Sequence, residues 1–237
     1  MAPKLERLPG GMTLDTAGGF PLSTDSMCLG AFCPVFRGAR AADLGSGSGT
    51  LGLLLLGREK ALSVAGVEID PTAHQTALAN IRRNGLEGNL RSILGDICDI
   101  CSLFPPGAFD LVVSNPPYFS PGRGRSSPDS PRKTAREGAN CSLETVYGAA
   151  AWLLPTGGRF CLSARTEDLT ELLCLGRALA LEPKRLQFIR HRASAQPKVL
   201  LLECRKDGGR GLRLEPDLVL YEEDGRPTAQ MRKIYEL

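Results

Sequence analysis

Residues 39–56 read ARAADLGSGSGTLGLLLL and indicate a strand, a turn and a helix in succession. The small and apolar residues from Ala39 to Leu44 predict a buried strand, and the leucine-rich run from Thr50 to Leu56 predicts a buried helix. Further strands alternate with helical segments as far as Arg205. The chain is therefore expected to be an α/β protein with a mostly parallel sheet and helices on both faces.

The turn in this unit, DLGSGSG, is suited to holding a ligand. Gly45, Gly47 and Gly49 tolerate positive φ and let a ligand approach bare backbone, while the next helix presents unpaired N–H groups. Asp43 opens the motif. The dinucleotide fingerprint G-x-G-x-x-G would need glycine where this chain has Thr50, so a nicotinamide cofactor is disfavoured.

Two acidic positions follow the next predicted strands. Glu68 ends the strand that begins at Ser63 and lies 19 residues beyond Gly49, a distance typical of an acidic group that binds ribose hydroxyls. Asp70 competes for this role, although Pro71 after it favours a helix cap. A plain solvated strand end is the alternative for Glu68.

Asp96 and Ile97 come after the predicted strand Leu90–Leu94. The Asp96 carboxylate can accept a hydrogen bond from an adenine amino group, and the Ile97 backbone N–H can meet a ring nitrogen. A turn aspartate beside an apolar contact is the alternative interpretation of this pair.

A fourth motif, FDLVVSNPPY, occupies residues 109–118 and predicts a buried strand stopped by two prolines. In a rigid loop, the Asn115 side-chain oxygen and the Pro116 carbonyl can both accept from one planar NH₂ group, while Tyr118 offers a face for stacking. Two acceptors draw the amine protons out of the ring plane and expose its lone pair. The alternative is a strand-ending turn with a surface tyrosine.

DLGSGSG, VEID, GDI and SNPPYF, in this order and spacing, resemble a class I methyltransferase that uses S-adenosylmethionine. More narrowly, the chain resembles the bacterial family that methylates the exocyclic amino group of an adenine in the anticodon loop of valine tRNA. STDSMCLGAF, AREGANCSLE and the tail VLYEEDGRPTAQMRKIYEL extend the resemblance over nearly the whole chain. The Arg- and Pro-rich insert at residues 122–133 departs from it, which leaves substrate contacts there open.

The resemblance implies a seven-stranded sheet with a reversed last strand, and it implies roles for individual residues. It places Asp43, Gly45, Gly47 and Gly49 at the methionine end of the cofactor, Glu68 at the ribose, and Asp96 with Ile97 at the adenine. Asn115, Pro116 and Tyr118 would hold the target base. Asp25 is either near the cofactor or a helix cap, Arg136 binds a phosphate or a structural partner, and Pro117 and Phe119 would contact substrate.

The implied reaction is a direct displacement at the sulfonium methyl, which requires orientation and neutral acceptors but no strong base. A guanine amino group in rRNA and a glutamine amide of a release factor present similar NH₂ groups and stay open as substrates. A cofactor-binding RNA scaffold is the non-enzymatic alternative. His74 and His191 lie outside the motifs and are interpreted as structural or surface residues.

Length and sequence pattern suggest one domain with appendages. We expect an N-terminal extension at 1–38 that packs on the cofactor side, the methyltransferase domain at 39–211 with a mobile loop at 119–137, and a C-terminal strand and turn at 212–237. The sequence carries no signal for oligomeric state.

The net charge is only +3, but residues 183–213 hold nine Lys or Arg against two acidic residues. Such a local excess suits the phosphates of tRNA, with ordinary solvated surface as the alternative. No apolar run approaches membrane-spanning length, and the N-terminus lacks an apolar signal segment, so a cytoplasmic location is expected. The eight cysteines are expected to be reduced, and the single Cys98-x-x-Cys101 pair lacks partners at zinc spacing, so no metal is expected.

Overall fold

The computed structural model of the chain describes residues 4–16, 21–60, 62–116 and 142–236. In it, the glycine-rich turn joins the expected strand and helix. The helices are α1 Thr24–Phe32, α2 Thr50–Arg58, α3 Pro71–Arg83, α4 Ile100–Leu103, α6 Leu143–Leu153, α7 Leu169–Ala178 and α8 Ala229–Glu236. The strands are β1 Leu5–Arg7, β2 Thr13–Asp15, β3 Arg40–Leu44, β4 Ser63–Glu68, β5 Leu90–Leu94, β6 Leu111–Ser114, β7 Arg159–Arg165, β8 Leu181–Arg190, β9 Val199–Lys206, β10 Arg213–Leu214 and β11 Leu218–Val219. Three 3₁₀ turns complete the described elements: η1 Pro9–Gly11, η2 Ile97–Asp99 and η3 Thr166–Asp168.

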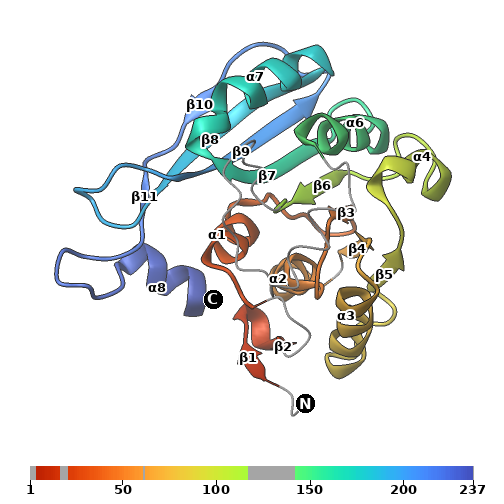
Figure 1. Cartoon of the computed structure of the whole chain (residues 1–237), viewed down its shortest axis with the longest axis horizontal. Helices are drawn as coiled ribbons and strands as arrows, with labels where there is room; N and C mark the ends of the chain where they lie inside the picture. The colour runs from red at the N-terminus through yellow and green to blue at the C-terminus, as the bar shows by residue number, and fades with distance from the viewer. Residues whose placement is uncertain (1–3, 17–20, 61, 117–141, 237) are drawn as a thin grey trace, which may run out of the picture.

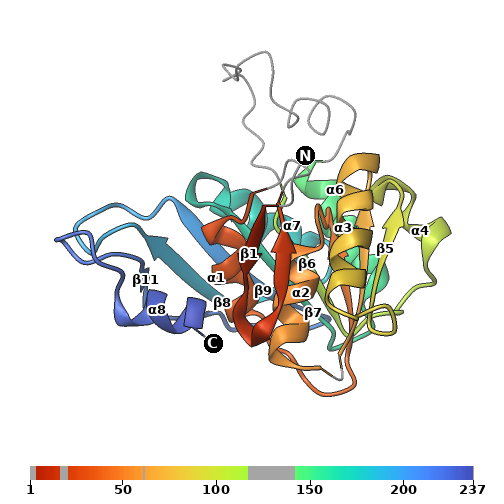
Figure 2. The same ribbon diagram turned by 90° about the horizontal axis from the view of Figure 1, so that it is seen from below.

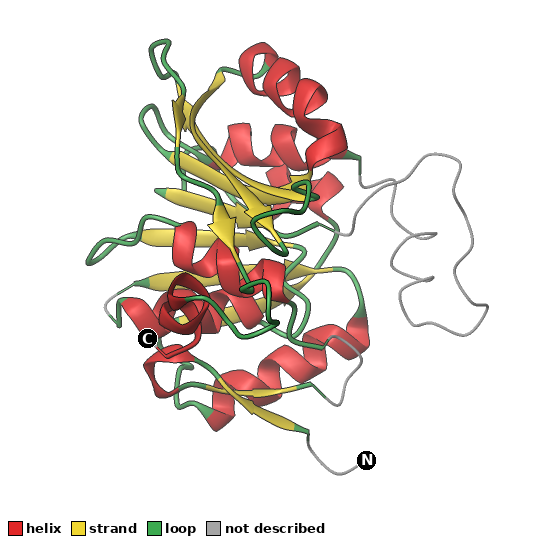
Figure 3. Ribbon diagram, turned by 90° about the vertical axis from the view of Figure 1, so that its left-hand side faces the viewer, coloured by secondary structure: helices red, strands yellow, loops and turns green. Residues whose placement is uncertain are grey.

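The main sheet follows the order β10-β8-β9-β7-β6-β3-β4-β5, and β11 also pairs with β8. All its pairings are parallel except those of β9, which runs antiparallel to both β7 and β8. Figure 3 shows these strands side by side in one twisted sheet. The expected mostly parallel fold with a reversed strand is confirmed, and β10 and β11 extend it beyond seven strands at the β8 edge.

Helices cover both faces of the sheet because each helix buries an apolar side. Residues of α1, α2 and α8 belong to one hydrophobic cluster, and residues of α4, α6 and α7 belong to a second cluster across the sheet. Figure 1 shows the two helical layers on opposite sides of the strands. The central strands β3, β4, β6, β7 and β9 are buried on both faces, which explains their largely apolar sequences.

The N-terminal extension forms the hairpin β1–β2, which lies against the layer of α1, α2 and α3 (Figure 2). The η1 turn approaches α2 so closely that a Cβ atom on Gly10 would lie 2.3 Å from the Gly57 carbonyl oxygen. Asn80 of α3, fully buried, joins this hairpin to the glycine-rich turn: its Nδ2 donates to the carbonyl oxygens of Ser48 at 3.0 Å and Asp15 at 3.3 Å. The extension thus supports the turn from outside the sheet.

The C-terminal segment differs from the expected strand and turn. The turn near Asp224 and Gly225 is present, but β10 and β11 precede it and the helix α8 follows it. Met231 and Ile234 of α8 are buried against the cluster that includes α1. The helix was not predicted, although Met231, Ile234 and Tyr235 have the i, i+3, i+4 spacing of one helix face.

Candidate active site at the carboxyl edge of the sheet

The predicted motifs meet at one edge of the sheet. They follow the carboxyl ends of β6, β3, β4 and β5, which are consecutive neighbours and run parallel. The Ser114 hydroxyl at the end of β6 donates to the Leu44 carbonyl oxygen at 2.8 Å and joins the two central strands where the motifs begin. In open α/β sheets, ligands bind at this edge.

The glycine-rich turn has the backbone that only glycine adopts readily. Gly45, Gly47 and Gly49 have φ angles of 74°, 55° and 84°. The Gly45 N–H donates to the Val67 carbonyl oxygen at 3.0 Å, and the Gly47 N–H donates to Glu68 Oε2 at 2.7 Å. The turn is therefore fastened to the end of β4 before any ligand binds.

Close approach of the turn to β4 depends on Gly66. A Cβ atom at Gly66 would lie 2.7 Å from both Cβ and Oγ of Ser46, a distance that forces one of the two segments to move. On the open side, a Cβ atom on Gly45 would meet nothing within 4 Å. The turn thus packs tightly on β4 and leaves space beside Gly45.

Glu68 is buried and holds two loops together. Its Oε2 accepts from the Gly47 N–H, and its Oε1 accepts from the Asp70 N–H at 2.8 Å. Each carboxylate oxygen keeps further acceptor capacity for a diol. Asp70 is a helix cap, as its alternative interpretation expected, because its Oδ1 accepts from the N–H groups of Thr72 and Ala73.

Asp96 and Ile97 lie after β5, at the outer end of this row. The Asp96 side chain accepts from the Cys98 N–H at 2.8 Å and caps the η2 turn, and Ile97 is buried. The contact to Cys98 engages Oδ1, so Oδ2 retains capacity for another donor.

Asn115 follows β6, and three hydroxyl groups hold its amide. Ser163 Oγ of β7 donates to Asn115 Oδ1. Asn115 Nδ2 donates to Ser26 Oγ at 2.9 Å and, more weakly, to Ser23 Oγ at 3.4 Å, both at the start of α1. The Ser23 hydroxyl also donates to Ser26 Oγ at 2.9 Å. Contacts at both ends of the amide restrict its rotation.

Comparison with known proteins indicates the family of the chain. The family model described as "Methyltransferase small domain" matches residues 27–127. A Bacteroides fragilis protein named "tRNA1(Val) (adenine(37)-N6)-methyltransferase" is 33% identical over 76% of this chain and 75% of its own length. A Tolumonas auensis protein of the same name is 32% identical over 86% of this chain and 84% of its own.

The chain belongs to the class I S-adenosylmethionine-dependent methyltransferases. Among solved structures, a predicted O-methyltransferase from Agrobacterium tumefaciens superposes with a TM-score of 0.71 at 17% identity and covers 90% of this methyltransferase and 98% of that chain. At this identity the match supports the fold alone.

The residues present fit S-adenosylmethionine, which carries positive charge at its sulfonium and ammonium groups. Asp43 of the methyltransferase is 1% exposed, and among the described residues its carboxylate oxygens have no side-chain partner, with only the Gly52 backbone N–H acting to lower its pKa. Burial, reinforced by the nearby Glu68 carboxylate, raises the pKa of Asp43 to about 8. Nearby positive charge favours the ionised form of such a group, so the site is electrostatically matched to a cation.

Asp43 is buried near the end of β3, directly before the glycine-rich turn. A role of Asp43 at the methionine end of the cofactor stays a prediction. Asp25 is the second residue of α1, where an acidic side chain suits the helix dipole, but the cap of that helix is Ser23. A cofactor contact by Asp25 stays a prediction.

Several predictions fall outside the described residues. These are the positions of Pro117, Tyr118, Phe119 and Arg136, together with the loop at 119–137. Pro116 is described and buried.

Ser26, Ser163, Gly66 and Asn80 of the methyltransferase were not predicted as site residues. Ser26 lies in the STDS segment, where Asp25 drew the prediction, and the other three stand in ordinary strand or helix sequences. Their roles arise from contacts between distant segments. Only Ser26 had a sequence signal, because STDS has the pattern of a helix N-terminus and so places Ser26 in the first turn of a helix.

The histidines of the methyltransferase have partners remote from these motifs. His74 Nδ1 lies 2.8 Å from Ser92 Oγ, and His191 packs against Tyr221. The seven cysteines within the described residues are free thiols. In that same part of the chain, no three His, Cys, Asp or Glu side chains are arranged to hold a metal ion, and no helix is long and apolar enough to cross a membrane.

Proposed function

We propose that this methyltransferase acts on the exocyclic amino group of an adenine in tRNA, in the anticodon region of valine tRNA by similarity to its relatives. The observation that carries the proposal is the fixed amide of Asn115 at the end of β6, next to the β3 strand that leads into the glycine-rich turn. A tRNA substrate also implies a cytoplasmic location.

The Asn115 oxygen is the acceptor for the target amine. An amide oxygen has two lone pairs, so accepting from Ser163 leaves one for the substrate. Hydrogen bonds from Nδ2 to Ser26 and Ser23 hold the amide in place. The Pro116 carbonyl is the second acceptor, and Tyr118 stacks on the base.

The cofactor supplies an electrophilic methyl group on a sulfonium. Gly45, Gly47 and Gly49 line its methionine end, and the Asp43 carboxylate near the end of β3 stabilises its positive charge. Glu68 binds the ribose hydroxyls, while Asp96 and Ile97 frame the adenine. This assignment uses the acceptor capacity left over by the hydrogen bonds to Gly47, Asp70 and Cys98.

Orientation carries most of the catalysis in this proposal. A neutral oxygen acceptor draws an amine proton aside without removing it, which aligns the lone pair with the methyl group. The proton passes to water after methyl transfer. Asn115 therefore acts as a catalytic residue without titrating.

The test is methyl transfer from labelled S-adenosylmethionine to separate samples of tRNA, rRNA and release factor. The proposal predicts label in tRNA, recovered as N6-methyladenine at one site by nuclease digestion and mass spectrometry. Label as a methylguanine in rRNA, or on a glutamine of release factor, would replace the proposed substrate by the corresponding alternative while keeping the amine chemistry.

A further inference from the structure

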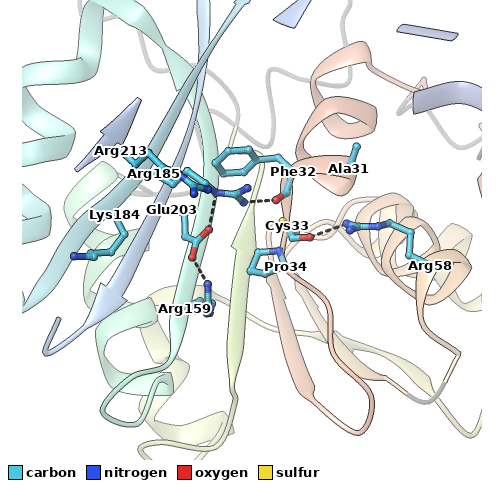
Figure 4. A pocket seen from close by; sticks show the side chains of 10 residues that line it. All are labelled: Ala31, Phe32, Cys33, Pro34, Arg58, Arg159, Lys184, Arg185, Glu203 and Arg213. Atoms are coloured by element: carbon cyan, nitrogen blue, oxygen red, sulfur yellow. Dashed lines mark hydrogen bonds and ion pairs between the residues drawn. The ribbon is translucent and has the colours of Figure 1, made fainter. Parts of the chain in front are cut away.

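A cavity of about 350 Å³ lies at the opposite edge of the sheet, where α1 ends. Its lining comes from the last residues of α1, the start of β7 and β8, the end of α2, and β10. The lining residues are Ala31, Phe32, Cys33, Pro34, Arg58, Arg159, Lys184, Arg185, Glu203 and Arg213. Figure 4 shows Arg58 approaching from one side and Arg159 and Arg185 from the other, with the end of α1 between them.

Two arginines stabilise the end of α1. Arg58 Nη1 donates to the carbonyl oxygens of Gly30 and Cys33, and Arg185 Nη2 donates to that of Phe32. Arg185 also stacks over the Phe32 ring, with 3.8 Å between its guanidinium carbon and the ring centroid. These contacts satisfy carbonyls that a helix leaves unpaired and hold both guanidinium groups at the cavity.

The cavity keeps an excess of positive charge after its internal pairs are counted. Glu203, 4% exposed, accepts from Arg159 Nη1 at 2.6 Å and from Arg185 Nε at 2.9 Å. Glu215 lies beside Arg213 and within 3.9 Å of Arg185. Four arginines of the cavity lie near two carboxylates, while Lys184 at its rim donates to the carbonyl oxygens of Gly209 and Arg210 (Figure 4). Each guanidinium has five N–H donors, more than these bonds engage.

We propose that this cavity binds a phosphate group of the RNA substrate. Its volume is at the lower end of the roughly 300–1,000 Å³ typical of small-ligand pockets, and planar guanidinium groups match the oxygens of a phosphate. Lys184, Arg185 and Arg213 belong to the positively charged stretch 183–213, which gives that stretch a defined binding position.

The position of the cavity relative to Asn115 supports RNA as the source of the phosphate. This part of the inference rests on the proposed function. α1 links the two sites: its first turn binds the Asn115 amide and its last turn lines the cavity. Nine helical residues span roughly 13 Å, equivalent to about four nucleotides at a rise of about 3.4 Å per nucleotide in a stacked strand. Because α1 is largely buried, an RNA strand has to pass around the protein between the two sites, so the phosphate at the cavity lies at least about four nucleotides from the target base.

The double variant Lys184→Gln/Arg213→Gln tests the proposal while leaving the Glu203 pairs intact. Its matched control is Arg82→Gln/Arg226→Gln, which removes the same charge from exposed positions outside the cavity. The dissociation constant for tRNA is measured over a salt series. Thermal unfolding, with and without inorganic phosphate at constant ionic strength, supplies a readout that is independent of RNA.

The cavity variant should weaken tRNA binding and lower the slope of log K against log salt by about 1 to 2, since each lost phosphate contact lowers it by nearly one. The control should change the slope much less. If tRNA binding is unchanged but inorganic phosphate stabilises the wild type and not the variant, the cavity binds free phosphate, and the phosphate chemistry stands without the RNA source.

The proposal would be overturned if the two double variants changed tRNA binding equally and inorganic phosphate stabilised the wild type no more than the cavity variant. Should the double variant unfold, the single change Lys184→Glu is put through both measurements under the same criteria. Failure of the proposed function is recognised separately. If the wild type binds no tRNA, thermal unfolding with inorganic phosphate still decides whether the cavity binds a phosphate group.

Discussion

Ser163 Oγ on β7 donates a hydrogen bond to Oδ1 of Asn115 at the end of β6. Ser163 is fully buried, and its neighbour across the amide, Ser26, comes from a helix 89 residues earlier in the chain than Asn115. The proposed acceptor of the target amine is thus oriented by two elements that contribute nothing to the NPPY motif itself.

Ser163→Ala should lower kcat by about tenfold, because a misoriented acceptor loses part of the transition-state alignment that positioning provides. The KM for S-adenosylmethionine should change little. Steady-state kinetics with saturating tRNA give both values, and Ser163→Cys, which keeps a weak donor, should recover part of the rate.

Ser92→Ala is the control for this change. Ser92 lies on β5, and its hydroxyl is bonded to His74 of α3 rather than to Asn115. A purely structural role for Ser163 would lower the melting temperature with unaltered kcat in the folded fraction. That result would remove Ser163 from the positioning of Asn115.

Gly66→Ala should abolish most cofactor binding. The added methyl group would stand 2.7 Å from Ser46, so the glycine-rich turn has to shift away from β4. Isothermal titration with S-adenosylmethionine measures the loss. Gly88→Ala is the control, because a Cβ atom there meets nothing within 4 Å, and cofactor affinity as weak as that of Gly66→Ala would contradict the steric explanation.

Asp43→Asn should change how stability depends on pH in the cofactor-free protein. The pKa of Asp43 is about 8 in the folded state against an ordinary value of 3.8, so the folded state binds this proton more tightly than the unfolded state. The stabilising contribution is complete below the ordinary value and is lost as the pH rises toward 8.

The melting temperature of Asp43→Asn should therefore rise relative to that of the wild type as the pH increases from about 5 to about 8. Thermal unfolding across this range measures the difference between the two proteins. A constant difference would show that Asp43 is already ionised in the folded state at low pH. Cofactor affinity of the variant should fall, because the buried charge that favours a cation is gone.

Local sequence was sufficient for the parts of the fold that depend on neighbouring residues. The strand before Gly45, the capped helix after Asp70 and the buried strand before Asn115 each combine an apolar run with turn residues, and each is present. Parallel strands place their carboxyl ends at one edge, and the four motifs follow neighbouring strands there.

Contacts between distant segments could not be predicted in the same way. Ser163 is one hydroxyl in an apolar strand, and its importance depends on the register of β7 against β6. Likewise, Asn80 is one polar residue of an amphipathic helix, and its bonds to Ser48 and Asp15 depend on how α3 packs against distant segments. Such features depend on tertiary packing, which a single sequence does not encode in any short pattern.

Asn115→Ala in the tRNA methylation assay is the most direct test of the central claim that a fixed amide oxygen aligns the target amine. Asn89→Ala, which removes an amide bonded to the Leu62 carbonyl, is the control. The claim predicts that kcat falls by at least about tenfold while the affinity for S-adenosylmethionine stays within error of the wild type. Unaltered turnover in Asn115→Ala would contradict it.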